Sequence, residues 1–313
     1  MDKKSVVIYG FGRMGLTHYA ILNQLLEDAN YIMVDSNKLV NSFARNNIKA
    51  MFFASDVRIK EPSDFTLICT PPMFHLGIIR ECISRGDSSI FVEKPFGGVD
   101  DNYEGLSDYF DRIKVGYVLR FVPVIQWIKK NLPVEDVVAF RGSYFSNTIE
   151  KKPNGWRNGP YSGVSNEMGS HILDLAVYTL GLDKSIIEVL DKRSIVSDVD
   201  DIVSFDIRSK NIDYSFHFDW VNKNYRKPVF KLVYEMNDGS KFIVDQQKVE
   251  HVNQNDQVIN KITTVDISKT TEFYLRGVEF SDQMKDFTGD QKVIGSVEES
   301  LITREIIKNV IEG

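Results

Sequence analysis

The feature that most constrains the fold of this chain is a glycine-rich hexapeptide, Gly10-Phe11-Gly12-Arg13-Met14-Gly15. It follows an apolar run at residues 5–9, typical of a buried strand, and opens an amphipathic stretch over 14–27, typical of a helix. In this setting the first glycine makes a tight turn, the second lets the backbone approach a pyrophosphate, and the third lets helix and strand pack closely. The helix N-terminus would then face the anion. The hexapeptide predicts a dinucleotide-binding unit, with a purely structural glycine turn as the alternative.

The first third of the chain alternates apolar segments with amphipathic ones, which favours a parallel sheet with helical crossovers. We expect strands at residues 5–9, 31–34, 50–53, 65–70, 89–92 and 113–117. We expect helices between them at 14–27, 38–46, 74–84 and 101–110. This pattern predicts an α/β Rossmann domain with a doubly wound parallel sheet over residues 1–118.

After residue 118 the pattern changes to long runs of strands. We expect helices at 124–130, 165–180, 273–287 and 297–311, and strands at 137–145, 186–190, 202–208, 214–220, 229–234 and 241–245. The sequence Asn237-Asp238-Gly239-Ser240 is a good hairpin turn between the last two of these strands. Residues 119–313 are therefore predicted to form an α+β domain with a large, open, mostly antiparallel sheet.

Composition excludes some classes of partner. A chain of 313 residues with a net charge of -6 does not favour nucleic acid or an anionic membrane. Cys69 and Cys82 lack metal-ligand spacing, and we expect reduced thiols and no metal site. The apolar run that follows the basic start ends at Gly10, too short for an export signal or a membrane span. A cytoplasmic location is the expectation.

Asp35 ends the second expected strand, about twenty residues beyond the glycine loop, where Rossmann domains hold the ribose. A carboxylate there binds both ribose hydroxyls and repels a 2′-phosphate, which predicts NAD rather than NADP. The neighbouring Lys38 would favour a phosphate, so NADP stays open as the less favoured cofactor.

Two further segments follow the ends of expected strands, where ligands of open α/β sheets bind. In Thr70-Pro71-Pro72, with His75 after it, two prolines stiffen a loop that we expect to contact the cofactor. The alternative is an ordinary helix start in which His75 completes the first turn. In Glu93-Lys94-Pro95, Glu93 and Lys94 are expected to contact the cofactor, and Lys94 to project toward the substrate; the alternative is a solvated strand exit.

The block from Gly163 to Asp174 carries a second polar constellation. On a regular helix Glu167, His171 and Asp174 fall at i, i+4 and i+7, so they would line one face. That face is expected to look into a substrate site. The alternative is a structural network in which two acids satisfy a buried histidine.

These segments resemble the glucose-fructose oxidoreductase, inositol dehydrogenase and rhizopine-catabolism (Gfo/Idh/MocA) family. The resemblance runs through the glycine loop, Thr70-Pro71-Pro72 with His75, Glu93-Lys94-Pro95, Gly116-Tyr117 with Arg120-Phe121, and the 163–174 block. It implies a Rossmann domain, a second domain whose open sheet serves oligomerisation, and NAD(P)-dependent redox chemistry on sugars or cyclic polyols.

The resemblance also implies roles for single residues. Lys94 would hydrogen-bond the reacting hydroxyl and His171 would exchange its proton. Glu167 stands where the family most often has aspartate, and Asp174 matches a further acidic position. Weaker candidates for the substrate wall are Tyr117, Arg120, Trp156 and Arg157, each of which is equally suited to packing.

The leading hypothesis is an NAD-dependent dehydrogenase for a sugar, a sugar derivative or a cyclic polyol, acting as a homodimer or homotetramer. A redox-neutral NAD-using enzyme of the same fold and a non-catalytic regulator that binds dinucleotide or sugar are the alternatives.

Overall fold

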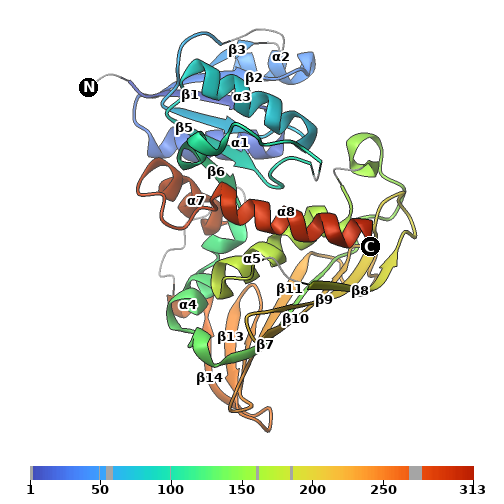
Figure 1. Ribbon diagram of the computed structural model, residues 1–313. Coiled ribbons are helices and arrows are strands. Elements are labelled where there is room, and N and C mark those ends of the chain that lie inside the picture. Colours follow the sequence, from blue (N-terminus) through green and yellow to red (C-terminus); the bar gives the residue numbers. More distant parts are fainter. Residues whose placement is uncertain are drawn as a thin grey trace. The chain divides into compact units, whose positions relative to one another are not determined.

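A computed structural model describes residues 3–48, 50–53, 59–98, 100–159, 162–183, 186–267 and 277–313. The chain divides into two compact units, one of residues 1–118 and 272–298, the other of 119–271 and 299–313 (Figure 1). The sequence pattern changes near residue 118 and groups residues 119–313 together, whereas the described residues 277–298 pack in the first unit.

The first unit is built on a six-stranded sheet of order β3-β2-β1-β4-β5-β6, in which all neighbouring strands run parallel. Its strands are β1 Ser5–Tyr9, β2 Asn30–Val34, β3 Met51–Phe53, β4 Phe65–Ile68, β5 Ser89–Glu93 and β6 Ile113–Gly116. Its helices are α1 Arg13–Leu25, α2 Lys38–Asn47, α3 His75–Arg85 and α7 Val278–Thr288. The predicted doubly wound sheet is confirmed. The strand order reverses between β1 and β4, the point at which such sheets bind ligands.

One expected helix of this unit is wrong. Residues 101–110 form a loop followed by a 3-10 helix, Ser107–Arg112. The side chain of Asn102 accepts a hydrogen bond from the backbone of Glu104, and Gly105 has φ +76°. Such side-chain turns compete with helix formation. Of the helix expected at 273–287, residues 273–276 lie outside the described residues, and α7 begins at Val278.

The second unit contains an eight-stranded sheet of order β14-β13-β12-β11-β7-β10-β9-β8. Only its central pair, β7 and β10, is parallel; all other neighbours are antiparallel, which confirms the predicted open, mostly antiparallel sheet. The strands are β7 Val137–Phe145, β8 Ile186–Arg193, β9 Ile202–Ser209, β10 Ile212–Asp219, β11 Val229–Met236, β12 Lys241–Val244, β13 Lys248–Val252 and β14 Val258–Thr263.

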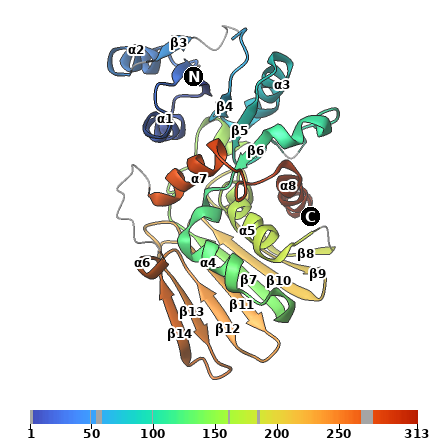
Figure 2. The ribbon, with the colours of Figure 1, turned by 90° about the vertical axis from the view of Figure 1, so that its left-hand side faces the viewer.

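Helices cover one face of this sheet (Figures 1 and 2). They are α4 Pro123–Asn131, a π-helical segment Ser165–Gly169, α5 Ser170–Leu180, α6 Thr264–Ile267 and α8 Val297–Glu312. The helical segment 165–180 approaches the sheet closely: a Cβ at Gly169 would meet the Phe218 ring at 2.5 Å, and one at Gly142 would meet Ile172 at the same distance. The part of the chain that the structure describes has no helix long and apolar enough to span a bilayer.

Candidate active site

The glycine loop between β1 and α1 has the geometry that a dinucleotide requires. Gly10 has φ +84°, and a Cβ there would lie 2.7 Å from the Cys69 carbonyl oxygen. A Cβ on Gly15 would lie 2.0 Å from the Gly10 oxygen, so only glycine lets α1 approach β1. At Gly12 nothing lies within 4 Å of the position of a Cβ. The two tight glycines fix the loop and the open one leaves room for a pyrophosphate.

Helix α1 begins at Arg13, followed by Met14, directly at this loop. Its first turn contains no acidic residue, and among the described residues no side chain caps it. Its amide groups are therefore available to an anion, and the helix dipole favours negative charge at this end.

Asp35 follows β2 and reaches the glycine loop. Its Oδ2 accepts a hydrogen bond from the Phe11 amide at 2.6 Å, and its Oδ1 accepts one from the Asn37 amide at 2.7 Å. The carboxylate thus connects the ends of the first two strands at the place where a cofactor ribose is expected.

A cavity of about 620 Å³ opens beside these residues, within the range of known cofactor sites. Thr70 and Pro71 lie on its wall, and the buried Oγ1 of Thr70 has no hydrogen-bond partner among the described residues. A buried polar atom without a protein partner is suited to a ligand. The cavity is lined by Tyr9, Gly10, Gly12, Val34, Asp35, Ser36, Cys69, Thr70, Pro71, Met73, Phe74, Gly77, Ile78 and Glu81.

His75 and Pro72 are buried and are not among the residues that line this cavity. The two ring nitrogens of His75 lie 2.8 Å from the Thr70 carbonyl oxygen and 3.1 Å from the Pro95 carbonyl oxygen. Burial lowers the pKa of His75, which favours a neutral ring. His75 therefore links the loop that follows β4 to the loop that follows β5.

Lys94 directly follows β5, in the loop that His75 contacts. Glu93 is the last residue of the strand, and its Oε1 lies 2.7 Å from Nε2 of the fully buried His18. The strand end is thus held on both sides of Lys94. His18 was not identified from the sequence because a lone histidine within an apolar helix face gives no local signal.

In the second unit, Glu167 lies in the π-helical segment and is held by two neighbours. The Ser162 hydroxyl donates a hydrogen bond to its Oε1 at 2.6 Å, and Arg157 Nε lies 3.6 Å from its Oε2. The Arg157 guanidinium lies 5.0 Å from the ring centroid of Trp156. The structure thus brings three predicted residues together, and His171 follows in the first turn of α5, partly exposed.

Asp174 lies three residues after His171 on α5. It is fully buried, and its carboxylate accepts hydrogen bonds from Arg120 at 2.6 and 2.8 Å. Burial raises its pKa to about 6 although Arg120 acts in the opposite direction. Tyr117 and Arg120 are buried as well. The Arg120 guanidinium offsets the cost of burying the Asp174 carboxylate, because ions taken out of water need a partner of opposite charge.

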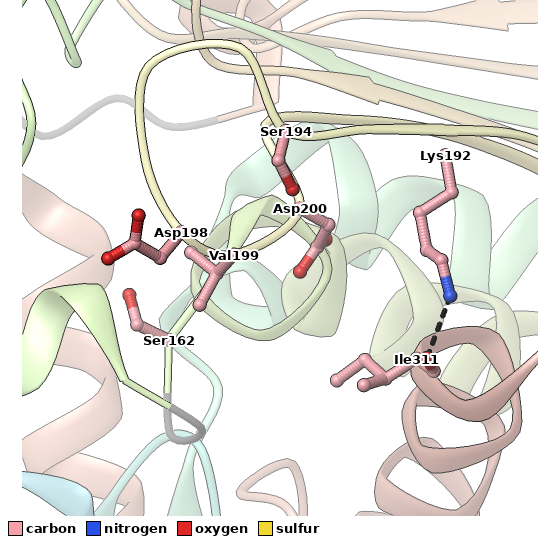
Figure 3. A pocket seen from close by; sticks show the side chains of 7 residues that line it. All are labelled: Ser162, Lys192, Ser194, Asp198, Val199, Asp200 and Ile311. Carbon is pink, nitrogen blue, oxygen red and sulfur yellow. Dashed lines mark hydrogen bonds between the residues drawn. The ribbon is translucent and has the colours of Figure 1, made fainter.

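A smaller cavity of about 270 Å³ lies in the second unit (Figure 3). Its polar groups are already engaged: Lys192 donates a hydrogen bond to the Ile311 carbonyl at the end of α8, and Asp200 accepts one from the Ser165 amide at 2.8 Å. Burial raises the pKa of Asp200 to about 6. Asp200 therefore supports the segment that carries Glu167. It is a role that no local motif could have indicated. The lining residues are Ser162, Lys192, Ser194, Asp198, Val199, Asp200 and Ile311.

Comparisons with known proteins identify what the chain is similar to. Residues 4–112 match the profile of the Gfo/Idh/MocA proteins, an oxidoreductase family with an NAD-binding Rossmann fold. The sequences of curated proteins give no match.

Solved structures resemble the chain over nearly its whole length. A levoglucosan dehydrogenase in complex with NADH is 18% identical, covers 99% of this chain and 96% of its own, and has a TM-score of 0.81. An oxidoreductase domain protein from Kribbella flavida is 15% identical over 99% and 96%, with a TM-score of 0.82. A UDP-N-acetylglucosamine 3-dehydrogenase from Acidithiobacillus ferrooxidans is 13% identical over 100% and 98%, with a TM-score of 0.76. At these identities the likeness is one of fold.

Proposed function

We propose that this chain, whose residues 4–112 match an oxidoreductase family with an NAD-binding Rossmann fold, belongs to that Gfo/Idh/MocA family and is a dehydrogenase for a sugar, a sugar derivative or a cyclic polyol. It would transfer a hydride between NAD and a carbon that carries a hydroxyl or keto group. The observation that carries the proposal is the cavity beside Gly12, with Asp35 and the buried Thr70 hydroxyl on its wall.

The preference for NAD over NADP is part of the proposal. It is supported by the carboxylate of Asp35, which lines the cavity and would meet a 2′-phosphate with like charge. When bound, NAD supplies the acceptor or donor of the hydride.

The chain's own residues would manage the proton and the charge at the reacting oxygen. Lys94 would donate a hydrogen bond from Nζ to that oxygen and stabilise negative charge as it develops. His171 would take up the hydroxyl proton on an imidazole nitrogen, since its ordinary pKa lies near neutrality. Glu167, held by Ser162 and Arg157, would orient a substrate hydroxyl or the imidazole.

The sugar-type substrate is inferred from chemistry and from the proteins of the same fold. An aromatic face such as that of Trp156 suits the apolar side of a sugar ring, and a planar guanidinium such as that of Arg157 suits a carboxylate or phosphate. Two proteins of similar structure are a levoglucosan dehydrogenase and a UDP-N-acetylglucosamine 3-dehydrogenase. We further infer a homodimer or homotetramer, because the described helices cover one face of the eight-stranded sheet and another subunit could cover the other (Figures 1 and 2). A cytoplasmic location is also part of the proposal.

The test is cofactor reduction by a panel of substrates. Purified protein receives NAD with levoglucosan, inositols, free sugars or sugar nucleotides, and NADH absorbance is followed. We expect turnover with one class, and the variant Lys94→Ala should lower kcat/KM by about 10²-fold or more. Lys60→Ala, which removes an exposed lysine, serves as the control.

The outcomes separate the alternatives. Cofactor that stays bound through turnover without net NADH formation would indicate a redox-neutral enzyme. Two results together would contradict an enzymatic function and favour a regulator. The protein would bind NADH without turning over any substrate, and Lys94→Ala would bind NADH as the unaltered protein does.

A further inference from the structure

The cavity of the first unit extends beyond the parts that the glycine loop and Asp35 explain. Part of its lining is apolar and comes from the 3-10 turn Pro72–Phe74 and from α3, with Met73, Phe74 and Ile78. Among the described lining residues, α3 and β1 add the polar side chains of Glu81 and Tyr9. This wall has the properties of a site for a flat aromatic base with one polar edge.

Strand order indicates which half of a dinucleotide this part of the cavity would take. The pyrophosphate is expected at the glycine loop after β1, and the adenosine ribose at Asp35 after β2. The cavity wall contains the ends of β1, β2 and β4 but not Lys94, which follows β5. The apolar extension therefore belongs to the adenine half, on the side away from the reacting ring.

Glu81 is held so that its carboxylate has a fixed direction. Its Oε1 accepts a hydrogen bond from the Tyr9 hydroxyl at 2.8 Å and lies 3.4 Å from Arg85 Nη1. Arg85 is itself anchored by a 2.5 Å contact with the buried Asp87. The side chain of Glu81 remains 37% exposed, and its Oε2 has no hydrogen bond to any described residue. One oxygen is fixed and the other can accept a hydrogen bond from a ligand in the cavity.

We propose that Glu81 selects the adenine base of the cofactor by accepting a hydrogen bond from its exocyclic amino group. The inference rests on the proposed use of NAD and adds a determinant of base identity. A carboxylate is an acceptor only, and the adenine amino group is a donor. Tyr9 is less suited to this role because its hydroxyl oxygen already accepts a hydrogen bond from Arg85 Nη1 at 2.8 Å. Hypoxanthine carries a carbonyl oxygen at the same position, and that oxygen would face the carboxylate without a proton between them.

The experiment compares two reduced dinucleotides, NADH and the analogue with hypoxanthine in place of adenine, by fluorescence titration of the nicotinamide. For the unaltered protein we expect the hypoxanthine analogue to bind about tenfold more weakly, as for a lost hydrogen bond to a charged group. In Glu81→Gln the ratio of the two dissociation constants should fall to one or below, because Tyr9 and Arg85 hold the amide oxygen and leave the amide nitrogen, a donor, toward the base. Glu104→Gln, an exposed glutamate outside the cavity wall, should keep the ratio of the unaltered protein.

The failures of the two proposals differ. If neither dinucleotide binds, the use of NAD is contradicted. If both bind to the unaltered protein with equal affinity, the role of Glu81 is contradicted while the proposed function stands. A third result would show that another residue selects the base. In it, the ratio of the two dissociation constants is above one and equal in the unaltered protein and in Glu81→Gln, and circular dichroism shows that both proteins are folded.

Discussion

At the scale of single residues, Asp35 has a structural contact, and we propose that it also selects the cofactor. Its carboxylate accepts the Phe11 amide proton, which ties the glycine loop to β2. The variant Asp35→Asn keeps an acceptor for that amide but removes the charge. Two like charges about 4 Å apart repel by about 4 kcal/mol near a protein surface. We therefore expect the preference for NADH over NADPH, measured as the ratio of dissociation constants, to fall by about tenfold or more, since much of that repulsion is relieved.

The matched control is Asp28→Asn, because the side chain of Asp28 is 83% exposed and lies outside the cavity wall. It should keep the ratio of the unaltered protein. An unchanged ratio in Asp35→Asn would show that the residue acts only as a structural link.

Residues whose role depends on their neighbours in sequence were predicted best. Gly10 and Gly15 have the close contacts that the hexapeptide implies. In contrast, Arg120 and Asp174 pair with each other across 54 positions in the sequence, and burial rather than motif decides their role. Such pairs cannot be inferred from a single sequence, since nothing local distinguishes a buried ion pair from a binding site.

At the scale of elements, His75 links the loop after β4 to the loop that carries Lys94. Removing the ring in His75→Ala leaves the Pro95 carbonyl without this neighbour and loosens the position of Lys94. A small displacement of a group near the reaction is costly. We expect kcat to fall about tenfold or more, while the dissociation constant of NADH, measured by fluorescence, changes little. His251→Ala, in β13, is the control. Equal losses in binding and turnover would instead mean general damage to the first unit.

The π-helical form of the segment before α5 depends on a contact from outside the segment. The π-helical turn at Ser165–Gly169 receives its first hydrogen bonds from Asp200, whose backbone and side chain accept the amide protons of Val164 and Ser165. An i, i+4, i+7 pattern assumes a regular α-helix. A partner 35 positions away in the sequence cannot be read from that pattern.

At the scale of the whole molecule, both sheets were predicted from hydrophobic periodicity, because parallel and antiparallel sheets leave different patterns of burial. The packing of residues 277–298 in the first unit was not predicted. Phe287 of α7 is fully buried and packs edge-on against Phe65 and Phe91, with ring centroids 5.6 and 5.5 Å apart. Long-range aromatic contacts of this kind have no signature in the order of elements.

This packing makes residues 277–298 part of the dinucleotide-binding unit. The free energy of unfolding tests this assignment. Phe287→Ala should lower the free energy of unfolding of the first unit by about 3–5 kcal/mol, as for other buried aromatic side chains. The transition of that unit is recognised because NADH raises its midpoint. Leu39→Ala, in α2 of the same unit and 81% exposed, should change the transition little. A loss below about 1 kcal/mol in Phe287→Ala would mean that the first unit is complete without α7.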